Sequence, residues 1–103
     1  MGDILPYPLT RTKALEIIRE LSRVSSRQFY THHAKERMRE RGFTTSDVLD
    51  CLQKGRINEG PFQAANGSWQ FTMIWFRAGA QIQVVAALDT DEKGNYLIII
   101  TTI

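Results

Sequence analysis

Residues 68–76 read Ser-Trp-Gln-Phe-Thr-Met-Ile-Trp-Phe, and this stretch decides the fold class. Apolar residues recur at every second position, which is typical of a β-strand with one buried face. In an extended chain Trp69, Phe71, Met73 and Trp75 lie on one face, and Gln70, Thr72, Ile74 and Phe76 lie on the other. The stretch therefore predicts a strand whose aromatic face packs against other elements.

The same alternation continues through the second half of the chain. Further strands are predicted at residues 57–64, 81–88 and 96–103. Asn66-Gly67 predicts a two-residue hairpin turn with positive φ at both positions, and other turns are predicted at residues 78–80 and 91–95. The last strand is apolar on both faces, which favours a place inside the sheet rather than at its edge.

Helical spacing of apolar residues dominates the first half of the chain. Helices are predicted at residues 11–24 after the N-cap Thr10, at 31 or 32 to 41, and from the start signal of residues 44–47 to residue 54. Thr44 and Asp47 imitate a capping box, and Gly42 is the expected left-handed stop of the second helix. Residues 27–30 fit either a brief extended piece or a linker.

This order of elements predicts an α+β fold with the helices packed on one face of an antiparallel sheet of three to four strands. The length of 103 residues fits a single domain spanning residues 1–103. The single cysteine, Cys51, excludes a disulfide framework and most zinc sites, and it falls on the apolar stripe of the third helix. Neither a membrane span nor a basic-then-apolar leader is recognisable, which predicts a cytoplasmic protein.

The charges are unevenly distributed along the chain. Residues 11–41 hold nine Lys or Arg against four Glu, a surplus of +5, although the net charge of the whole chain is only +2. A basic segment of this kind attracts phosphates or an acidic partner. The alternative is a solvated helix face on which neighbouring Glu and Arg side chains pair.

His33, Arg37 and Arg41 follow one another at intervals of four residues, so they form one row along the second helix. The row is one position away from the apolar pair Ala34 and Met38, which places it at the margin of the buried face. An imidazole can transfer protons near neutral pH, and guanidinium groups suit a phosphodiester and its transition state. The row therefore holds the parts that a metal-independent RNA-cleaving site needs, a proton carrier and fixed positive charge, and catalysis by it is one hypothesis.

Structural interpretations compete with this prediction. His33 can instead bond a backbone carbonyl, and Arg37 or Arg41 can pair with Asp47, Asp50 or Glu59. His32 and His33 point about 100° apart on a helix, so they do not bind one metal together. We predict no metal site and no cofactor.

Other side chains are candidates for contacts with RNA. Polar candidates on the second helix and on the strands are Lys35, Gln70, Arg77 and Gln83. Trp69 and Trp75 are candidates for stacking on a base, although their two-residue alternation favours packing in the core.

The segment His33-Ala34-x-x-Arg37-Met38-x-x-Arg41-Gly42-Phe43 resembles the opening motif of a bacterial and phage family, the domain of unknown function 4258. The resemblance continues through Asp47-Val48, Gly55-x-Ile57, Trp69-x-Phe71, Val84-Val85, Leu88-Asp89 and Ile98-Ile99-Ile100-Thr101. The resemblance runs from Phe29 to the end of the sequence, which predicts a toxin-like core at residues 28–103 and a helical extension at residues 1–27.

Domains of this family are similar to the RelE/ParE-type toxin fold, including the BrnT and MqsR toxins. The resemblance implies helices against a curved antiparallel sheet and a ribonuclease that cleaves mRNA, often on the ribosome, without a metal. It also implies neutralisation by an antitoxin protein, and it singles out His33, Arg37 and Arg41 as the site. Unlike the better-known toxins, this chain lacks a dense Lys/Arg/Tyr cluster on its last strands.

Two functions are therefore expected from the sequence. The first is the toxin ribonuclease of a toxin-antitoxin system. The second is a non-catalytic module that uses the basic face to hold an acidic protein or nucleic acid. Burial discriminates between them, since a His33 that is fully enclosed and bonded to a backbone carbonyl favours the module, whereas an open cleft beside Arg37 favours the enzyme.

Overall fold

Most helices precede most strands along the chain. This order is predicted by the change near Gly55 from helical spacing of apolar residues to two-residue alternation. The computed structural model describes residues 5–103. The elements are α1 (Arg11–Leu21), a short 3-10 helix η1 (Ser25–Arg27), β1 (Gln28–Tyr30), α2 (His32–Arg41), α3 (Thr45–Lys54), β2 (Arg56–Gln63), β3 (Trp69–Arg77), β4 (Ala80–Asp91) and β5 (Gly94–Thr102). The α+β class is confirmed. Residues 1–4 lie outside the described residues, so the prediction that no leader opens the chain falls partly outside the structure.

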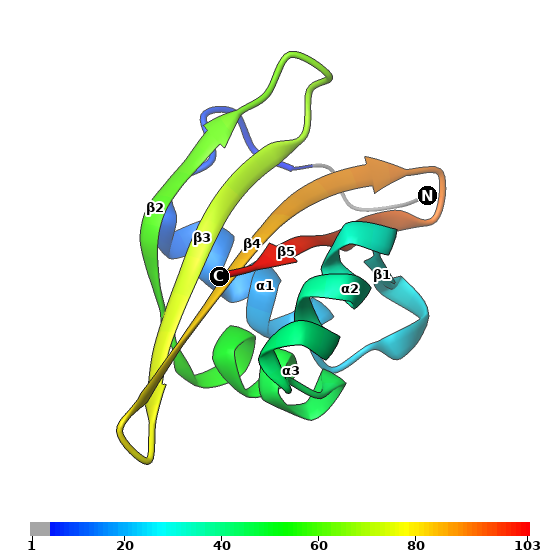
Figure 1. Cartoon of the computed structure of the whole chain (residues 1–103). Helices are drawn as coiled ribbons and strands as arrows, with labels where there is room; N and C mark the ends of the chain where they lie inside the picture. Colours follow the sequence, from blue (N-terminus) through cyan, green and yellow to red (C-terminus); the bar gives the residue numbers. More distant parts are fainter. Residues whose placement is uncertain (1–4) are drawn as a thin grey trace.

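The sheet has five strands in the order β1-β5-β4-β3-β2, so the expectation of three to four strands was wrong (Figure 1). The additional strand is β1, whose three residues pair in parallel with β5, and the sheet is therefore mixed rather than antiparallel. A three-residue strand leaves too short a pattern to tell it from a linker. Its pairing places β5 inside the sheet, as its two apolar faces predict.

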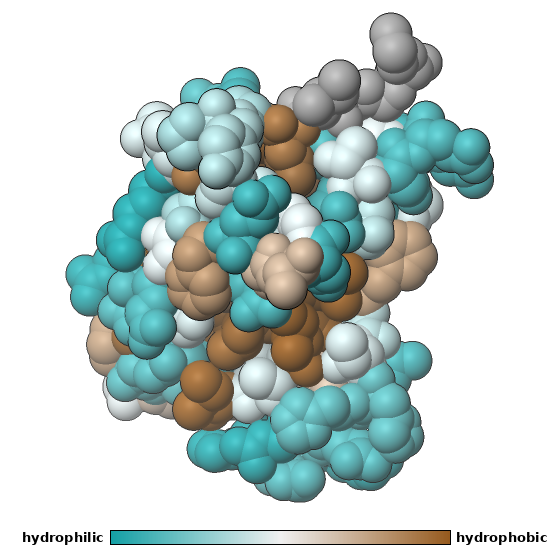
Figure 2. Space-filling view, turned by 90° about the horizontal axis from the view of Figure 1, so that it is seen from above, coloured by the Kyte–Doolittle hydropathy of each residue, from teal (hydrophilic) through white to brown (hydrophobic). Residues whose placement is uncertain are grey.

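The helices cover one face of the sheet and leave the other more accessible. On the helix side, β3 and β4 bury Phe71, Met73, Val84, Ala86 and Leu88 against Ile18 of α1 and Leu52 of α3. The opposite side is called the open face, and its residues on β3 and β4 are Gln70, Thr72, Ile74, Phe76, Gln81, Gln83, Val85 and Ala87. Figure 2 shows the molecule from above, where apolar side chains gather between hydrophilic margins.

The caps predicted for the first and third helices are present, and Thr31 is in addition the N-cap of α2. The Oγ1 atoms of Thr10 and Thr31 accept hydrogen bonds from the backbone N–H groups of Lys13 and Ala34, at 3.2 and 3.0 Å. Thr44 and Asp47 form a complete capping box at the start of α3. The helix α1 ends at Leu21, three residues before the predicted end at residue 24.

The two-residue hairpin turn lies at a different place from the predicted one. Asn66 does not have a positive φ, and its Oδ1 instead accepts hydrogen bonds from the N–H and hydroxyl of Ser68, at 3.0 and 2.7 Å. The turn with positive φ at both positions is formed by Ala78 (φ 50°) and Gly79 (φ 81°) between β3 and β4. The side-chain acceptor of Asn66 thus favours a wider loop over the tight turn.

Ala78 adopts a left-handed conformation that costs an L-residue with a Cβ roughly 1–2 kcal/mol. Asparagine tolerates this region better because its side chain bonds the local backbone. We expect Ala78→Asn to raise the free energy of unfolding by about 1 kcal/mol, measured by urea denaturation. The same substitution at Ala80, which is in β4, should not stabilise the protein, and a stabilisation of equal size there would contradict this explanation.

Candidate functional site

The helix α2 lies beside the end of β5, close to the C-terminus (Figure 1). Thr31 precedes α2 and attaches it to β5 by two hydrogen bonds. Its N–H donates to Ile99 O at 3.0 Å, and its hydroxyl donates to Ile100 O at 2.8 Å. Ala34 and Met38 are buried on one side of α2. Of the row, Arg37 is half-buried and contacts β5 through the Thr102 carbonyl, whereas His33 and Arg41 are exposed. The predicted place at the margin between helix and sheet therefore holds for Arg37.

His33 is exposed and makes no hydrogen bond or ion pair with residues 5–103. Its neighbour His32 differs, because its Nε2 lies 2.7 Å from Glu36 Oε1 one turn along the helix. The alternative in which His33 is sealed by a backbone carbonyl is therefore wrong. Its imidazole is free to meet a ligand from solvent.

The two arginines of the row differ in their contacts. Arg37 is 30% exposed, and its Nε donates to Thr102 O at 3.4 Å while its Nη1 lies 3.4 Å from Glu40 Oε2. Arg41 is exposed and has no hydrogen bond or ion pair within the described chain. Because eight residues of helix rise about 12 Å, the row presents one imidazole and two guanidinium groups along a strip of that length.

Part of the basic surplus has a structural role rather than a binding role. Arg11 Nε donates to Gly60 O at 2.7 Å, and Arg19 donates to Gln53 O and Gly55 O, each at 2.9 Å. These contacts tie α1 to β2 and to the end of α3. The charge pattern of residues 11–41 therefore overstates the number of cations available to a phosphate.

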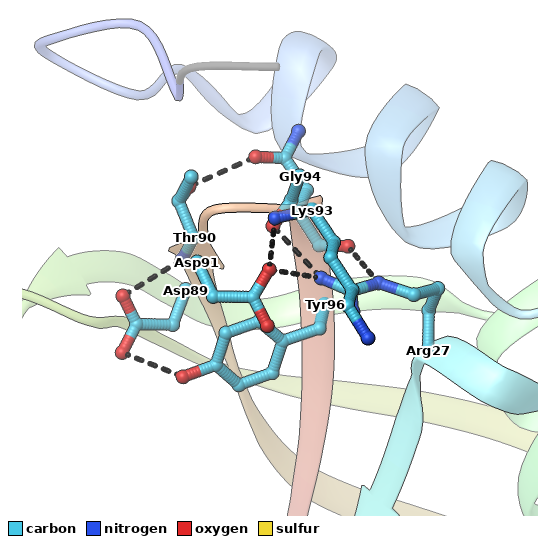
Figure 3. A network of polar contacts seen from close by, with 8 residues as sticks. Arg27, Asp89, Thr90, Asp91, Lys93, Gly94 and Tyr96 are labelled. Carbon is cyan, nitrogen blue, oxygen red and sulfur yellow. Dashed lines mark hydrogen bonds and ion pairs between the residues drawn. The ribbon is translucent and has the colours of Figure 1, made fainter. Parts of the chain in front are cut away.

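Arg27 also binds within the protein, at the hairpin between β4 and β5 (Figure 3). Its guanidinium donates to Asp91 Oδ1 at 2.7 Å and to Gly94 O at 2.9 Å, and it lies 5.5 Å from the centre of the Tyr96 ring. This hydrogen bond from Arg27 lowers the pKa of Asp91. Burial, with the charge of Asp89 as a smaller cause, raises the pKa of Tyr96.

Arg77 was a candidate RNA contact, but the structure pairs it with two carboxylates of α3. Its Nη2 lies 2.6 Å from Asp47 Oδ1, and its Nη1 lies 3.1 Å from Asp50 Oδ2. The alternative partners for these carboxylates, Arg37 and Arg41, are not the ones used. The reason is that Arg77 alternates onto the helix side of β3, where α3 lies.

The contacts of Asp47 make stability depend on pH. The hydrogen bond from the Thr44 N–H, aided by Arg77, holds the pKa of Asp47 below its ordinary value of 3.8. A depressed folded-state pKa contributes stability above the unfolded value, and this contribution is lost as pH falls through the folded value. At neutral pH we expect Asp47→Asn to lower the free energy of unfolding by about 1 kcal/mol, the typical contribution of a helix cap.

Urea denaturation between neutral pH and pH ~3 measures this dependence. The stability difference between wild type and Asp47→Asn should narrow as pH falls. Asp50→Asn is the control, because it removes the other partner of Arg77 and keeps the capping box. A difference that stays constant with pH would contradict the role given to the Asp47 carboxylate.

The remaining candidate contacts do not join the row. Lys35 lies on the opposite flank of α2 and lines a cleft of about 340 Å³ with Arg39, Phe43 and Thr45. Gln70 and Gln83 are half-buried on the open face, paired with Ala87 and Ile74 of the neighbouring strands. Gln83 therefore lies one strand from β5 and so nearest to the row, whereas Lys35 faces away from it.

A second group of side chains was not recognised as a site from the sequence. Lys54, Arg56, Trp75 and Phe76 line a cleft of about 220 Å³ beside the start of β2. Trp69 belongs to the core, but Trp75 is only half-buried and has Lys54 Nζ at 5.3 Å from its ring centre. Of these four residues, the sequence made only Trp75 a candidate, for stacking on a base.

Two observations bear on other chemistries. Burial raises the pKa of the Cys51 thiol to about 12, which makes it unsuited to act as a nucleophile. Residues 5–103 contain no group of three or more His, Cys, Asp or Glu side chains arranged to hold a metal ion. Within the same residues every helix is too short or too polar to cross a membrane.

The fold and the row on α2 define an α+β domain with a helix-borne histidine and arginine strip. Residues 30–103 match the family described as domain of unknown function (DUF4258). The chain therefore belongs to this family, and the predicted membership is confirmed. Comparison with curated proteins and with solved structures gives no match in either case.

Proposed function

We propose that this protein is a toxin-type ribonuclease that cleaves mRNA with His33, Arg37 and Arg41. The observation that carries the proposal is the state of His33, which is exposed and free of hydrogen bonds to residues 5–103. It stands one helical turn from Arg37, whose Nε donates to the Thr102 carbonyl at 3.4 Å. A histidine that held the fold together would be buried and bonded to it, and His33 is neither.

The proposed reaction is an attack of a ribose 2′-oxygen on the neighbouring phosphorus. His33 accepts the proton of the 2′-hydroxyl as the new P–O bond forms, and it returns a proton to the 5′-oxygen as the old P–O bond breaks. The products are a 2′,3′-cyclic phosphate and a free 5′-hydroxyl. Arg37 and Arg41 stabilise the extra negative charge on the phosphoryl oxygens in the transition state.

The resemblance to RelE/ParE-type toxins supports this function, because the helices lie on one face of a sheet in the expected order. On this proposal the protein acts in the cytoplasm on mRNA, including mRNA bound to ribosomes. An antitoxin protein would neutralise it by covering the row on α2. Fold likeness alone does not carry function, so the proposal rests on the row.

A non-catalytic binding module is the second candidate. It is favoured by the place of the row, which does not line the clefts around Trp75, Phe43, Tyr96 and Asn95. Exposed apolar side chains also lie on the sheet, with Phe62 at 53%, Phe76 at 60% and Ile103 at 48% exposure. Such a surface suits a partner protein as well as RNA.

Inducible expression in bacteria, with growth and RNA integrity followed together, tests the proposed function. Expression should arrest growth, and RNA fragments should end in cyclic phosphates. Purified protein is then incubated with free RNA and with translating ribosomes, because toxins of this type often require the ribosome. Normal growth with intact RNA in both settings would favour the binding module.

A further inference from the structure

The cleft beside β2 combines an exposed aromatic ring with two cations. Its lining residues are Lys54, Gly55, Arg56, Ile74, Trp75 and Phe76. Phe76 is 60% exposed, and Arg56 is exposed with no side-chain hydrogen bond or ion pair to residues 5–103. Lys54 has one weak partner, Asp50, at 3.7 Å. The cleft lining includes no carboxylate, and Asp50, which approaches Lys54 from outside the lining, is itself paired with Arg77 at 3.1 Å.

Strand register places Arg56 and Phe76 on the same face. Arg56 pairs with Ile74, and Phe76 lies two residues beyond Ile74 on β3, so both side chains emerge on the open face. Diagonal neighbours of this kind are roughly 7–8 Å apart, within reach of long side chains. One nucleotide can therefore contact the Phe76 ring with its base and Arg56 with its phosphate.

The register also connects this cleft to the row on α2. Arg56 pairs with Ile74, Ile74 pairs with Gln83, and Gln83 O accepts the N–H of Ile103 at the end of β5. Arg37 contacts the carbonyl of the preceding residue, Thr102, from the other side of β5. Four adjacent strands span about 14 Å, which a short single-stranded oligonucleotide can bridge.

We propose that Phe76 and Arg56 form an RNA subsite in which a base stacks on the Phe76 ring and a phosphate binds Arg56 and Lys54. It deepens the proposed ribonuclease function and rests on it, because the same RNA strand would continue across Gln83 to the row on α2. The aromatic cleft of Phe29 and Tyr96 is a poorer candidate. Asp91 also lines that cleft and would repel a phosphate.

Binding of a fluorescent single-stranded oligonucleotide tests the subsite. The probe carries 2′-O-methyl riboses, so it cannot be cleaved and binding is measured separately from catalysis. Fluorescence anisotropy should show Phe76→Ala binding roughly 5-fold or more weaker than wild type, as expected for loss of one stacked base. Phe76→Trp should bind the probe with an affinity close to that of wild type, because an indole ring can also stack on a base. Arg56→Gln should reduce the slope of log affinity against log salt by about 0.7, one single-strand phosphate contact.

Phe62→Ala is the matched control, because Phe62 is similarly exposed on the same face but pairs with Gln70, far from Arg56. It should bind the probe like wild type. The subsite is overturned if wild type does not bind the probe, or if Phe76→Ala loses no more affinity than Phe62→Ala. The proposed function fails separately, if wild type binds the probe through Phe76 but cleaves no unmodified RNA, free or ribosome-bound.

Discussion

His33→Ala is expected to lower the rate of RNA cleavage by roughly 10²- to 10⁴-fold, the usual contribution of a general acid or base. The substitution removes the one proton-transferring group of the row and leaves Arg37 in place to bind the phosphate. RNA affinity should therefore fall much less than the cleavage rate. Single-turnover cleavage, with RNA binding measured in parallel, separates the two effects.

His32→Ala provides the control for this experiment. His32 is adjacent in sequence and 87% exposed, but it points to Glu36 and away from the row. Its replacement should leave cleavage within a few-fold of wild type, and expression of this variant should still arrest growth. Equal activity of wild type and His33→Ala would remove His33 from the mechanism. Equal loss in both variants would indicate damage to α2 rather than removal of a catalytic group.

Ile18→Ala is expected to reduce the free energy of unfolding by about 2–5 kcal/mol. Ile18 is fully buried in the core although it belongs to α1, which lies outside the residues that match the family. Truncation removes buried apolar surface and leaves a cavity beneath the sheet. Urea denaturation measures the loss, and growth arrest at lower temperature shows whether the folded fraction keeps its activity.

Leu15→Ala is the companion variant, because Leu15 is in the same helix but only half-buried. Leu15→Ala should lower the free energy of unfolding clearly less than Ile18→Ala does. An unchanged stability of Ile18→Ala would mean that α1 is an independent appendage, and the family core would then be expected to fold without it. A large loss means instead that the core of this protein includes its extension.

The sequence predicts the regular elements well because strong local signals coincide there. The capping threonines, the stop at Gly42 and the alternation around Phe71 all act within a few residues, and the structure confirms each of them. The row on α2 follows from the helical period alone. Its open position beside β5 required the structure, since it depends on which strand the helix contacts.

Long-range pairing explains what the sequence did not predict. The strand β1 exists only because β5 offers it a parallel partner, and no pattern within three residues reveals this. The guanidinium of Arg77 has the chemistry of a phosphate ligand, but the tertiary fold brings the carboxylates of Asp47 and Asp50 to it. Arg56 and Phe76 are distant in sequence and become neighbours only through the register of β2 and β3.

The contacts of Arg11 have a consequence for how copies of this protein behave together. A sheet that ends in unpaired backbone groups can recruit the edge of another molecule and grow into fibres. On β2, the outermost strand, Arg11 occupies the carbonyls of Ile57, Asn58 and Gly60. The opposite border is only three residues long. Both borders thus resist edge-to-edge aggregation, and Arg11→Ala should increase the tendency of concentrated protein to form thioflavin-positive assemblies.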